Sequence, residues 1–309
     1  MVAWRRLAYF FALSAALLSQ GAPIQYDDLH QYGVVLVPPS SPDFAGMLAD
    51  IQRRVANPVA GSPSYPGGAP QISEIDRAFS AILVNRGTKP IASLNLVWRN
   101  KHGKLSLGLM NGPTVLDAFS LPPTEATWAN YWRVILPGSK RYIGARTMVG
   151  DNSDVRPPAP AEQGGVDLFP HPEPLLGGDA IDSMSIDGLF FADGTFVGPD
   201  TQKMWERTVY NVRAQQALAT IARAGHDRGE SSNQVMSEIR AFTGPSERRF
   251  PNQHGSQLSQ LTTAGDFQDW YVAQIGRSLD RQSHNGGDDA VVAMLLKWSN
   301  IKSPNFIRM

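Results

Sequence analysis

The chain has no cysteine in its 309 residues. This absence excludes disulfide bonds, thiol catalysis and a lipid-anchored cysteine. It also has no excess of charge, since 28 basic residues balance 28 acidic ones. A neutral chain sets up no overall field that would attract nucleic acid or anionic lipid, so we expect no nucleic-acid partner.

Motifs that compel a particular chemistry are also missing. There is no Gly-x-Ser-x-Gly nucleophile elbow and no phosphate-cradling glycine loop. The six histidines are scattered, and none has a second histidine three or four residues away: His30, His102, His171, His226, His254 and His284. A zinc site assembled from distant segments stays open. The sequence therefore assigns no catalytic, cofactor-binding or metal-ligating residue.

The start of the chain has the pattern of a secretory signal. Arg5–Arg6 precede an apolar stretch, Leu7–Leu18, and small residues follow up to Gly21. We expect cleavage to remove residues 1–21 and to leave Ala22 first. The alternative is a buried helix or an uncleaved anchor, but the apolar stretch is shorter than the roughly 20 residues that a membrane span needs. No later segment comes near that length, so we expect no membrane span after cleavage.

Residues 22–56 are predicted to form a short strand–helix segment. Gly33–Val37 is a strand ended by two prolines, and Ser41 is the expected N-cap of a helix. Residues 57–71 are rich in Pro, Gly and Ser and are expected to be a linker.

Residues 72–200 show a period of two, which is typical of strands. Leu94, Leu96 and Trp98 alternate with other residues, and a polar turn leads to a second such run, which predicts a hairpin. The expected strands are Phe79–Val84, Leu94–Trp98, Leu105–Leu109, Tyr131–Leu136, Tyr142–Val149, Ile181–Phe191 and Phe196–Val197. Short strands at this spacing suggest a β-sandwich. The proline-rich stretch 150–180 is expected to be a long loop, either functional or disordered.

Residues 201–309 change to a period of 3.6 and predict a helical region. Asp200 is the expected cap of the first helix and Gly225 its end. The second helix is expected to bury Phe242 and to stop at Gly244–Pro245. Two more helices are expected from about Asp266 and Asp288, with these apolar residues on their buried faces: Phe267, Trp270, Tyr271, Ile275, Leu279, Val291, Val292, Leu295 and Leu296.

The most distinctive string runs from Ile186 to Asp200 and holds three aspartates. Asp187, Asp193 and Asp200 could supply oxygen ligands to Ca²⁺, although their spacing is not that of an EF-hand loop. The structural interpretation accounts for the residues better. Asp193–Gly194 suits a type I′ hairpin turn, which needs positive φ at both central residues.

Other candidates also have ordinary structural interpretations. The oxygen-rich stretch 150–154 is typical of a surface turn, and the acids in 286–289 suit the first turn of a helix. Four aromatic residues could form a sugar-stacking platform if exposed, but at alternating strand positions they are expected in the core: Trp98, Trp128, Tyr131 and Trp132.

A resemblance rests on the phrase from Ser80 to Gly87, on Lys89–Ile91 and on Leu94–Trp98. In this part, residues 72–200, the chain resembles immunoglobulin-like or fibronectin-like sandwich modules of bacterial surface proteins. The phrase from Asp187 to Asp200 is similar to ones in uncharacterised secreted bacterial proteins. The resemblance implies a sandwich fold and assigns no ligand or catalytic residue.

Together these observations predict an α+β protein with an antiparallel, Ig-like β-sandwich followed by a C-terminal helical region. We expect a secreted or periplasmic, non-catalytic binding or assembly protein of the bacterial envelope, with a protein or glycan partner and no cofactor. The alternative is a secreted hydrolase of envelope or environmental polymers with its site near the 150–180 loop.

Overall fold

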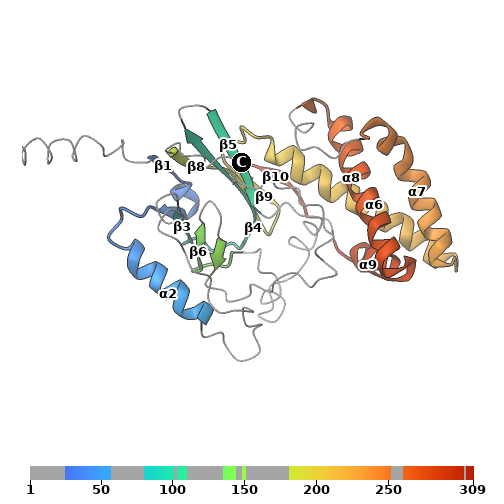
Figure 1. Cartoon of the computed structure of the whole chain (residues 1–309), viewed down its shortest axis with the longest axis horizontal. Coiled ribbons are helices and arrows are strands. Elements are labelled where there is room, and N and C mark those ends of the chain that lie inside the picture. The colour runs from blue at the N-terminus through green and yellow to red at the C-terminus, as the bar shows by residue number, and fades with distance from the viewer. Residues whose placement is uncertain are drawn as a thin grey trace, which may run out of the picture.

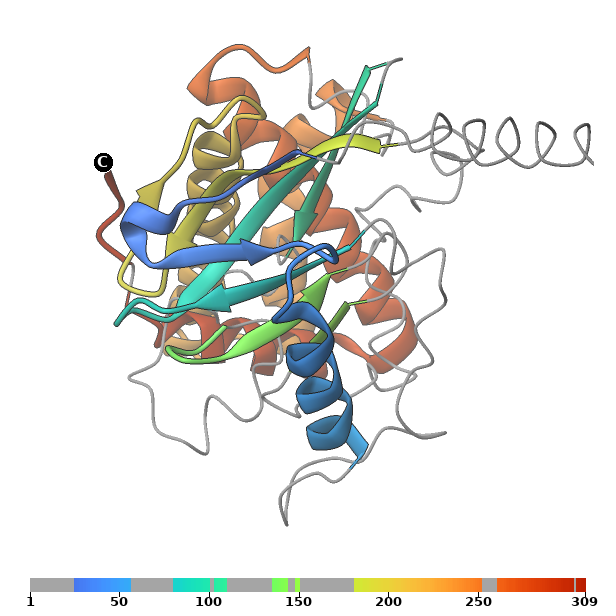
Figure 2. The ribbon, with the colours of Figure 1, turned by 90° about the vertical axis from the view of Figure 1, so that its left-hand side faces the viewer.

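The computed structural model describes residues 25–56, 80–100, 103–109, 135–143, 148–150, 181–251, 260–302 and 304–309. These residues form a mixed α+β structure with two β-sheets. In Figure 1 the N-terminal helix lies on one side of the sheets and the C-terminal helices on the other. Figure 2 shows the sheets face on, with the C-terminal helices behind them.

The smaller sheet is antiparallel in the order β2-β3-β6-β7. Its strands are β2 (Val34–Val37), β3 (Ala81–Asn85), β6 (Lys140–Ile143) and β7 (Met148–Gly150). Along β3, Ala81 and Leu83 pack toward the larger sheet, while Ile82 and Val84 pack toward helix α2 (Phe44–Ala56). Because successive side chains of a strand point to opposite faces, this sheet is buried on both sides.

The larger sheet has the order β10-β9-β8-β4-β5, and β1 pairs with β8. Its strands are β1 (Gln25–Asp27), β4 (Ile91–Asn100), β5 (Gly103–Leu109), β8 (Ile181–Phe191), β9 (Thr195–Val197) and β10 (Ile307–Arg308). The predicted hairpin is confirmed as β4 and β5. The prediction of purely antiparallel pairing is wrong, because β1 and β10 join their neighbours in parallel. Parallel strands need a long connection, and both reach this sheet from distant parts of the chain.

The two sheets meet at a shared apolar cluster. Its buried members come from both: Leu29, Val34, Leu36, Ala81, Leu83, Ile91, Leu94, Leu96, Trp98, Ile135, Ile143, Met184, Ile186, Leu189, Phe191 and Val197. The chain crosses between the sheets after Asn85. The Asn85 amide donates to the Lys89 and Ile135 carbonyls at 2.9 and 3.0 Å, and its oxygen accepts the Gly87 N–H at 3.1 Å. One buried asparagine therefore holds the turn that changes sheets.

Two features of the strand arrangement were not predicted. The segment 25–56 contributes β1 to the larger sheet and β2 to the smaller one, with a 3-10 turn (η1, His30–Tyr32) between them. The single strand predicted at Tyr142–Val149 is two strands, β6 and β7, that pair with each other.

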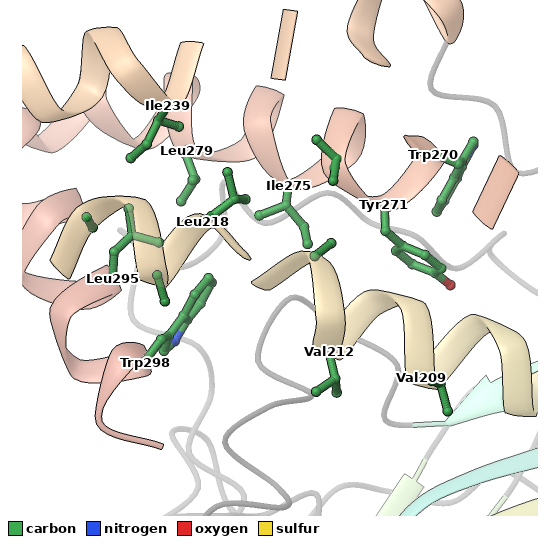
Figure 3. Close-up of a cluster of buried hydrophobic side chains, with 14 of the residues drawn as sticks. Val209, Val212, Leu218, Ile239, Trp270, Tyr271, Ile275, Leu279, Leu295 and Trp298 are labelled. Carbon is green, nitrogen blue, oxygen red and sulfur yellow. The ribbon is translucent and has the colours of Figure 1, made fainter. Parts of the chain in front are cut away.

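The C-terminal helices are α6 (Met204–Asp227), α7 (Ser232–Arg249), α8 (Ala264–Gly286) and α9 (Asp288–Ser299). Ser231 and Thr263 begin α7 and α8 with reciprocal capping boxes. The helices share an apolar cluster that also takes in Ala92, Phe190 and Phe196 of the larger sheet. Figure 3 shows part of this cluster, where side chains from α6, α7, α8 and α9 meet. No helix in the described ranges is long and apolar enough to span a membrane.

Helix α7 corrects two predictions. It does not stop at Gly244–Pro245 but continues to Arg249. Proline inside a helix costs about 3 kcal/mol, so the last turn needs support from its neighbours. Arg249 supplies it by pairing with Asp266 and, at 2.6 Å, with Asp269 of α8. Phe242, expected in the core, is 43% exposed on the outer side of α7.

Candidate functional site

Asp187 is the extra residue of a β-bulge in β8, opposite Asn95 and Leu96 of β4. A bulge re-aims a side chain, and here it places a carboxylate among buried donors. One oxygen accepts the Thr201 N–H at 2.9 Å and the Thr201 hydroxyl at 2.6 Å. The other accepts the Gln202 N–H at 2.9 Å and the Asn95 amide at 3.2 Å. Asp187 therefore fastens the segment that leads into α6 to the middle of the larger sheet.

Asp200 lies ahead of α6 with a positive φ of 59°. The residue at the N-cap is Lys203, so the helix begins later than predicted. The Asp200 carboxylate still accepts the Trp205 N–H, at 3.1 Å, and pairs with Arg308 of β10 at 2.9 Å. Burial raises the pKa of Asp200, and the Trp205 N–H and the Arg308 charge partly offset that rise. Asp200 thus links the start of α6 to the last strand.

Asp193 does not form the predicted type I′ turn. Only Gly194 of the pair has a positive φ, of 89°, and its N–H donates to the Phe191 carbonyl at 2.9 Å. The connection is three residues long and ends with Gly194 in the left-handed region, which is the next most common kind of hairpin loop after the two-residue turns. The Asp193 carboxylate accepts the Thr195 N–H at 2.9 Å and pairs with Lys89 at 2.6 Å. The three aspartates are therefore held by separate sets of protein donors.

The remaining metal candidates also have protein contacts. Within the described ranges, no three His, Asp or Glu side chains are grouped as a metal site would need. His30 pairs with Asp28 and His284 contacts the Asp280 carbonyl at 2.7 Å. At the start of α9, Asp288 accepts a hydrogen bond from Ser283. Residues 151–180, which include most of the oxygen-rich stretch and of the proline-rich loop, lie outside the described residues. His102, His171 and His254 also lie outside them.

A Ser-x-x-Lys spacing also occurs, at Ser299, the last residue of α9, and Lys302. Such a spacing can mark a nucleophile and its base. Here the Ser299 hydroxyl donates to the Leu296 carbonyl at 2.7 Å and accepts from Arg223 at 3.1 Å. Ser299 therefore joins α9 to α6.

Of the four aromatic residues considered as a sugar platform, the described ranges contain Trp98. It is 4% exposed and belongs to the cluster between the sheets, as its alternating position predicts. Trp128, Tyr131 and Trp132 lie outside the described residues.

A site that the sequence analysis missed lies along α8. We name Trp270, Gln274, Arg277 and Ser278 the α8 polar row; they fall within about 100° on a helical wheel. Trp270, Gln274 and Ser278 are 1%, 4% and 4% exposed. The Trp270 Nε1, both amide atoms of Gln274, the Ser278 hydroxyl and the Arg277 Nε and Nη2 are buried without a hydrogen-bond partner in the described chain. Buried polar groups nearly always have partners, so this concentration on one helix makes the row the strongest candidate site of the described residues.

The row lies beside the end of α7. Arg277 Nη1 donates to the Phe250 carbonyl at 2.9 Å, and burial lowers the pKa of Arg277 while the charge of Glu247 raises it. Gly276 permits this close approach of the helices. A Cβ added there would lie 2.6 Å from Glu247 Oε1 and 2.8 Å from the Thr243 Cβ.

The row borders the apolar side of α8, since Trp270 also belongs to the apolar cluster that the helices share. Ile275 reaches toward Leu218 of α6 and Leu279 toward Ile239 of α7 (Figure 3). The sequence does carry a signal for the row, since Gln274 and Ser278 stand four residues apart beside an apolar stripe. A prediction that considers only the apolar residues of α8 does not detect this row.

Comparisons with known proteins add no relative. No family model, curated protein or solved structure matches the chain.

Proposed function

We propose that the protein is an exported, non-catalytic binding or assembly protein of the bacterial envelope and that it holds its ligand at the α8 polar row. The observation that carries this proposal is the set of buried polar atoms on Gln274, Arg277 and Ser278 without a partner in the described chain. Leaving a polar group buried and unpaired costs about 1–3 kcal/mol, so a fold that leaves several together is poised to bind a group that pairs with them.

The chemistry of the row supports binding over bond cleavage. It offers hydrogen-bond donors and acceptors on side chains of one rigid helix. The distinctive aspartates are occupied in holding the fold together, Asp187 at α6 and Asp200 at Arg308.

Export is supported by the signal pattern of residues 1–21. The first described strand, β1, begins at Gln25, so cleavage after Gly21 would remove no described element. The lack of cysteine accords with an envelope protein that does not rely on disulfide bonds.

For residues 72–200 we propose a sandwich of the Ig-like kind, completed by strands from the preceding segment. Its support is the buried cluster that the two sheets share, from Leu36 and Leu83 on one side to Leu94 and Leu189 on the other. The helical region then covers the outer face of the larger sheet through Phe190 and Phe196.

Fractionation of bacteria that express the full chain tests export. The protein should appear in the periplasm or medium, and N-terminal sequencing should start at Ala22 or within a few residues. A product that keeps Met1 in the membrane fraction would contradict it.

A thermal-shift screen of small molecules against the exported protein tests binding. The proposal expects stabilising ligands whose effect disappears in Gln274→Leu, with no turnover of envelope polysaccharide or protein substrates. Turnover of such polymers would favour the hydrolase instead.

A further inference from the structure

We propose that the α8 polar row binds a carboxylate-bearing ligand, with the Nε and Nη2 of Arg277 forming the two-pronged contact. This inference rests on the proposed function and deepens it by naming the ligand class. The observations behind it are which polar atoms of the row have a hydrogen-bond partner in the described residues and which have none.

One nitrogen of the Arg277 guanidinium already donates a hydrogen bond within the protein. Its Nη1 donates to the Phe250 carbonyl at 2.9 Å, which fixes the orientation of the group. The Nε and Nη2 lie on one edge and are buried without a partner in the described part of the chain. Two parallel N–H groups on one edge match the two oxygens of a carboxylate.

Three neighbouring groups extend this contact. Gln274 and Ser278 lie in the same sector of α8 as Arg277, which stands at its edge, and Trp270 lies one turn before Gln274. The Gln274 amide, the Ser278 hydroxyl and the Trp270 N–H are all buried donors without a partner in the described residues. The Gln274 oxygen adds an acceptor for a donor elsewhere on the ligand.

The local charge favours a monoanion. Glu247 and Arg281 both act electrostatically on Arg277, so an acidic side chain already lies near the guanidinium. A carboxylate would bring one negative charge beside Glu247, whereas a phosphate dianion would bring two. Carboxylate is therefore preferred to phosphate.

Isothermal titration calorimetry of the mature protein tests the ligand class, with sodium acetate, sodium benzoate, sodium phosphate and sodium chloride at equal ionic strength. Tetra-alanine and its C-terminal amide form a further arm, which distinguishes a peptide carboxylate from a small organic acid. We expect carboxylates to bind and phosphate, chloride and the amide to bind at least tenfold more weakly.

Arg277→Lys keeps the positive charge but loses the two-pronged edge, so it should weaken carboxylate binding at least tenfold. Arg248→Lys is the matched control, because Arg248 is exposed on α7, and it should bind as the unchanged protein does. Circular dichroism checks that both variants fold.

Equal carboxylate affinity in Arg277→Lys, or phosphate binding stronger than acetate, would overturn this inference. If a non-carboxylate bound and depended on Gln274 alone, the carboxylate assignment would fail while the proposed binding function would stand. Polymer turnover by the unchanged protein would remove the proposed function itself.

Discussion

The Asp187 carboxylate of β8 receives both the N–H and the hydroxyl of Thr201, 14 positions along the chain. Asp187 is 3% exposed, so these bonds are shielded from water. In Asp187→Asn an amide NH₂ replaces an acceptor and faces donors. We expect a loss of about 1.5–3 kcal/mol in the free energy of unfolding, measured by urea denaturation.

Asp193→Asn is the matched control for that experiment. The Lys89–Asp193 pair is about half exposed on both sides, so its loss should cost only about 0–1 kcal/mol. If Asp193→Asn cost as much as Asp187→Asn, or abolished a calcium-dependent rise in melting temperature, the structural interpretation of this segment would be wrong.

Gly194 has both a backbone and a steric requirement. Its φ is 89°, and a Cβ there would lie 2.6 Å from the Asn305 carbonyl oxygen. Gly138 has a similar φ of 79° but no atom within 4 Å of the added Cβ. We expect Gly138→Ala to cost about 1 kcal/mol through φ alone. Gly194→Ala should cost about 1–2 kcal/mol more, because it displaces the segment that hydrogen-bonds to it through Ile307.

Thermal and urea unfolding of these two glycine variants provide the comparison. Equal costs would mean that the contact with Asn305 contributes nothing and that only the φ angle matters.

Gln274→Leu tests whether the row is unpaired in the ligand-free protein. Replacing an unpartnered amide with an apolar side chain of similar size should raise the free energy of unfolding by about 1–2 kcal/mol. Gln215 of α6 is the control, because it is equally buried but donates to Asn211 at 2.8 Å. Gln215→Leu should therefore lower stability by about 1–3 kcal/mol. A destabilised Gln274→Leu variant would show that the amide already has a partner.

The raised pKa of Asp200 predicts a dependence of stability on pH. An acid whose pKa is higher in the folded state holds its proton more tightly there, so the folded state is favoured at low pH. Relative to Asp200→Asn, the free energy of unfolding should fall as the pH rises from 3.8, the ordinary value, through the raised pKa. Urea denaturation across this range measures the difference.

Arg308→Gln should raise the pKa of Asp200 further, because the Arg308 charge lowers it. NMR titration of the Asp200 carboxyl group measures this shift directly. An unchanged pKa would mean that the ion pair does not form in solution.

The spacing of apolar residues along the sequence predicted the strands and helices whose buried residues recur at a regular period. Leu94, Leu96 and Trp98 do form one buried face of β4, and Phe267, Ile275 and Leu279 lie on the buried side of α8. Pairing between distant segments could not be predicted in this way. The parallel addition of β1 beside β8 depends on a contact across more than 150 positions, which no local period encodes.

The functional candidates show the same division. Sequence reasoning selected Asp187 for its surroundings but could not foresee the bulge that turns it toward Asn95. It did not select Gln274 and Ser278, because single polar residues are common along the edges of the buried face of a helix. Only their burial without partners distinguishes them, and burial depends on the whole fold.

A high-resolution crystal structure of the protein purified from its exporting host tests the central claim most directly. The account predicts well-ordered non-protein density beside α8, within hydrogen-bond distance of Gln274, Arg277 and Ser278, with a planar end against the Arg277 edge. Protein side chains or isolated water molecules on all of these atoms would contradict it.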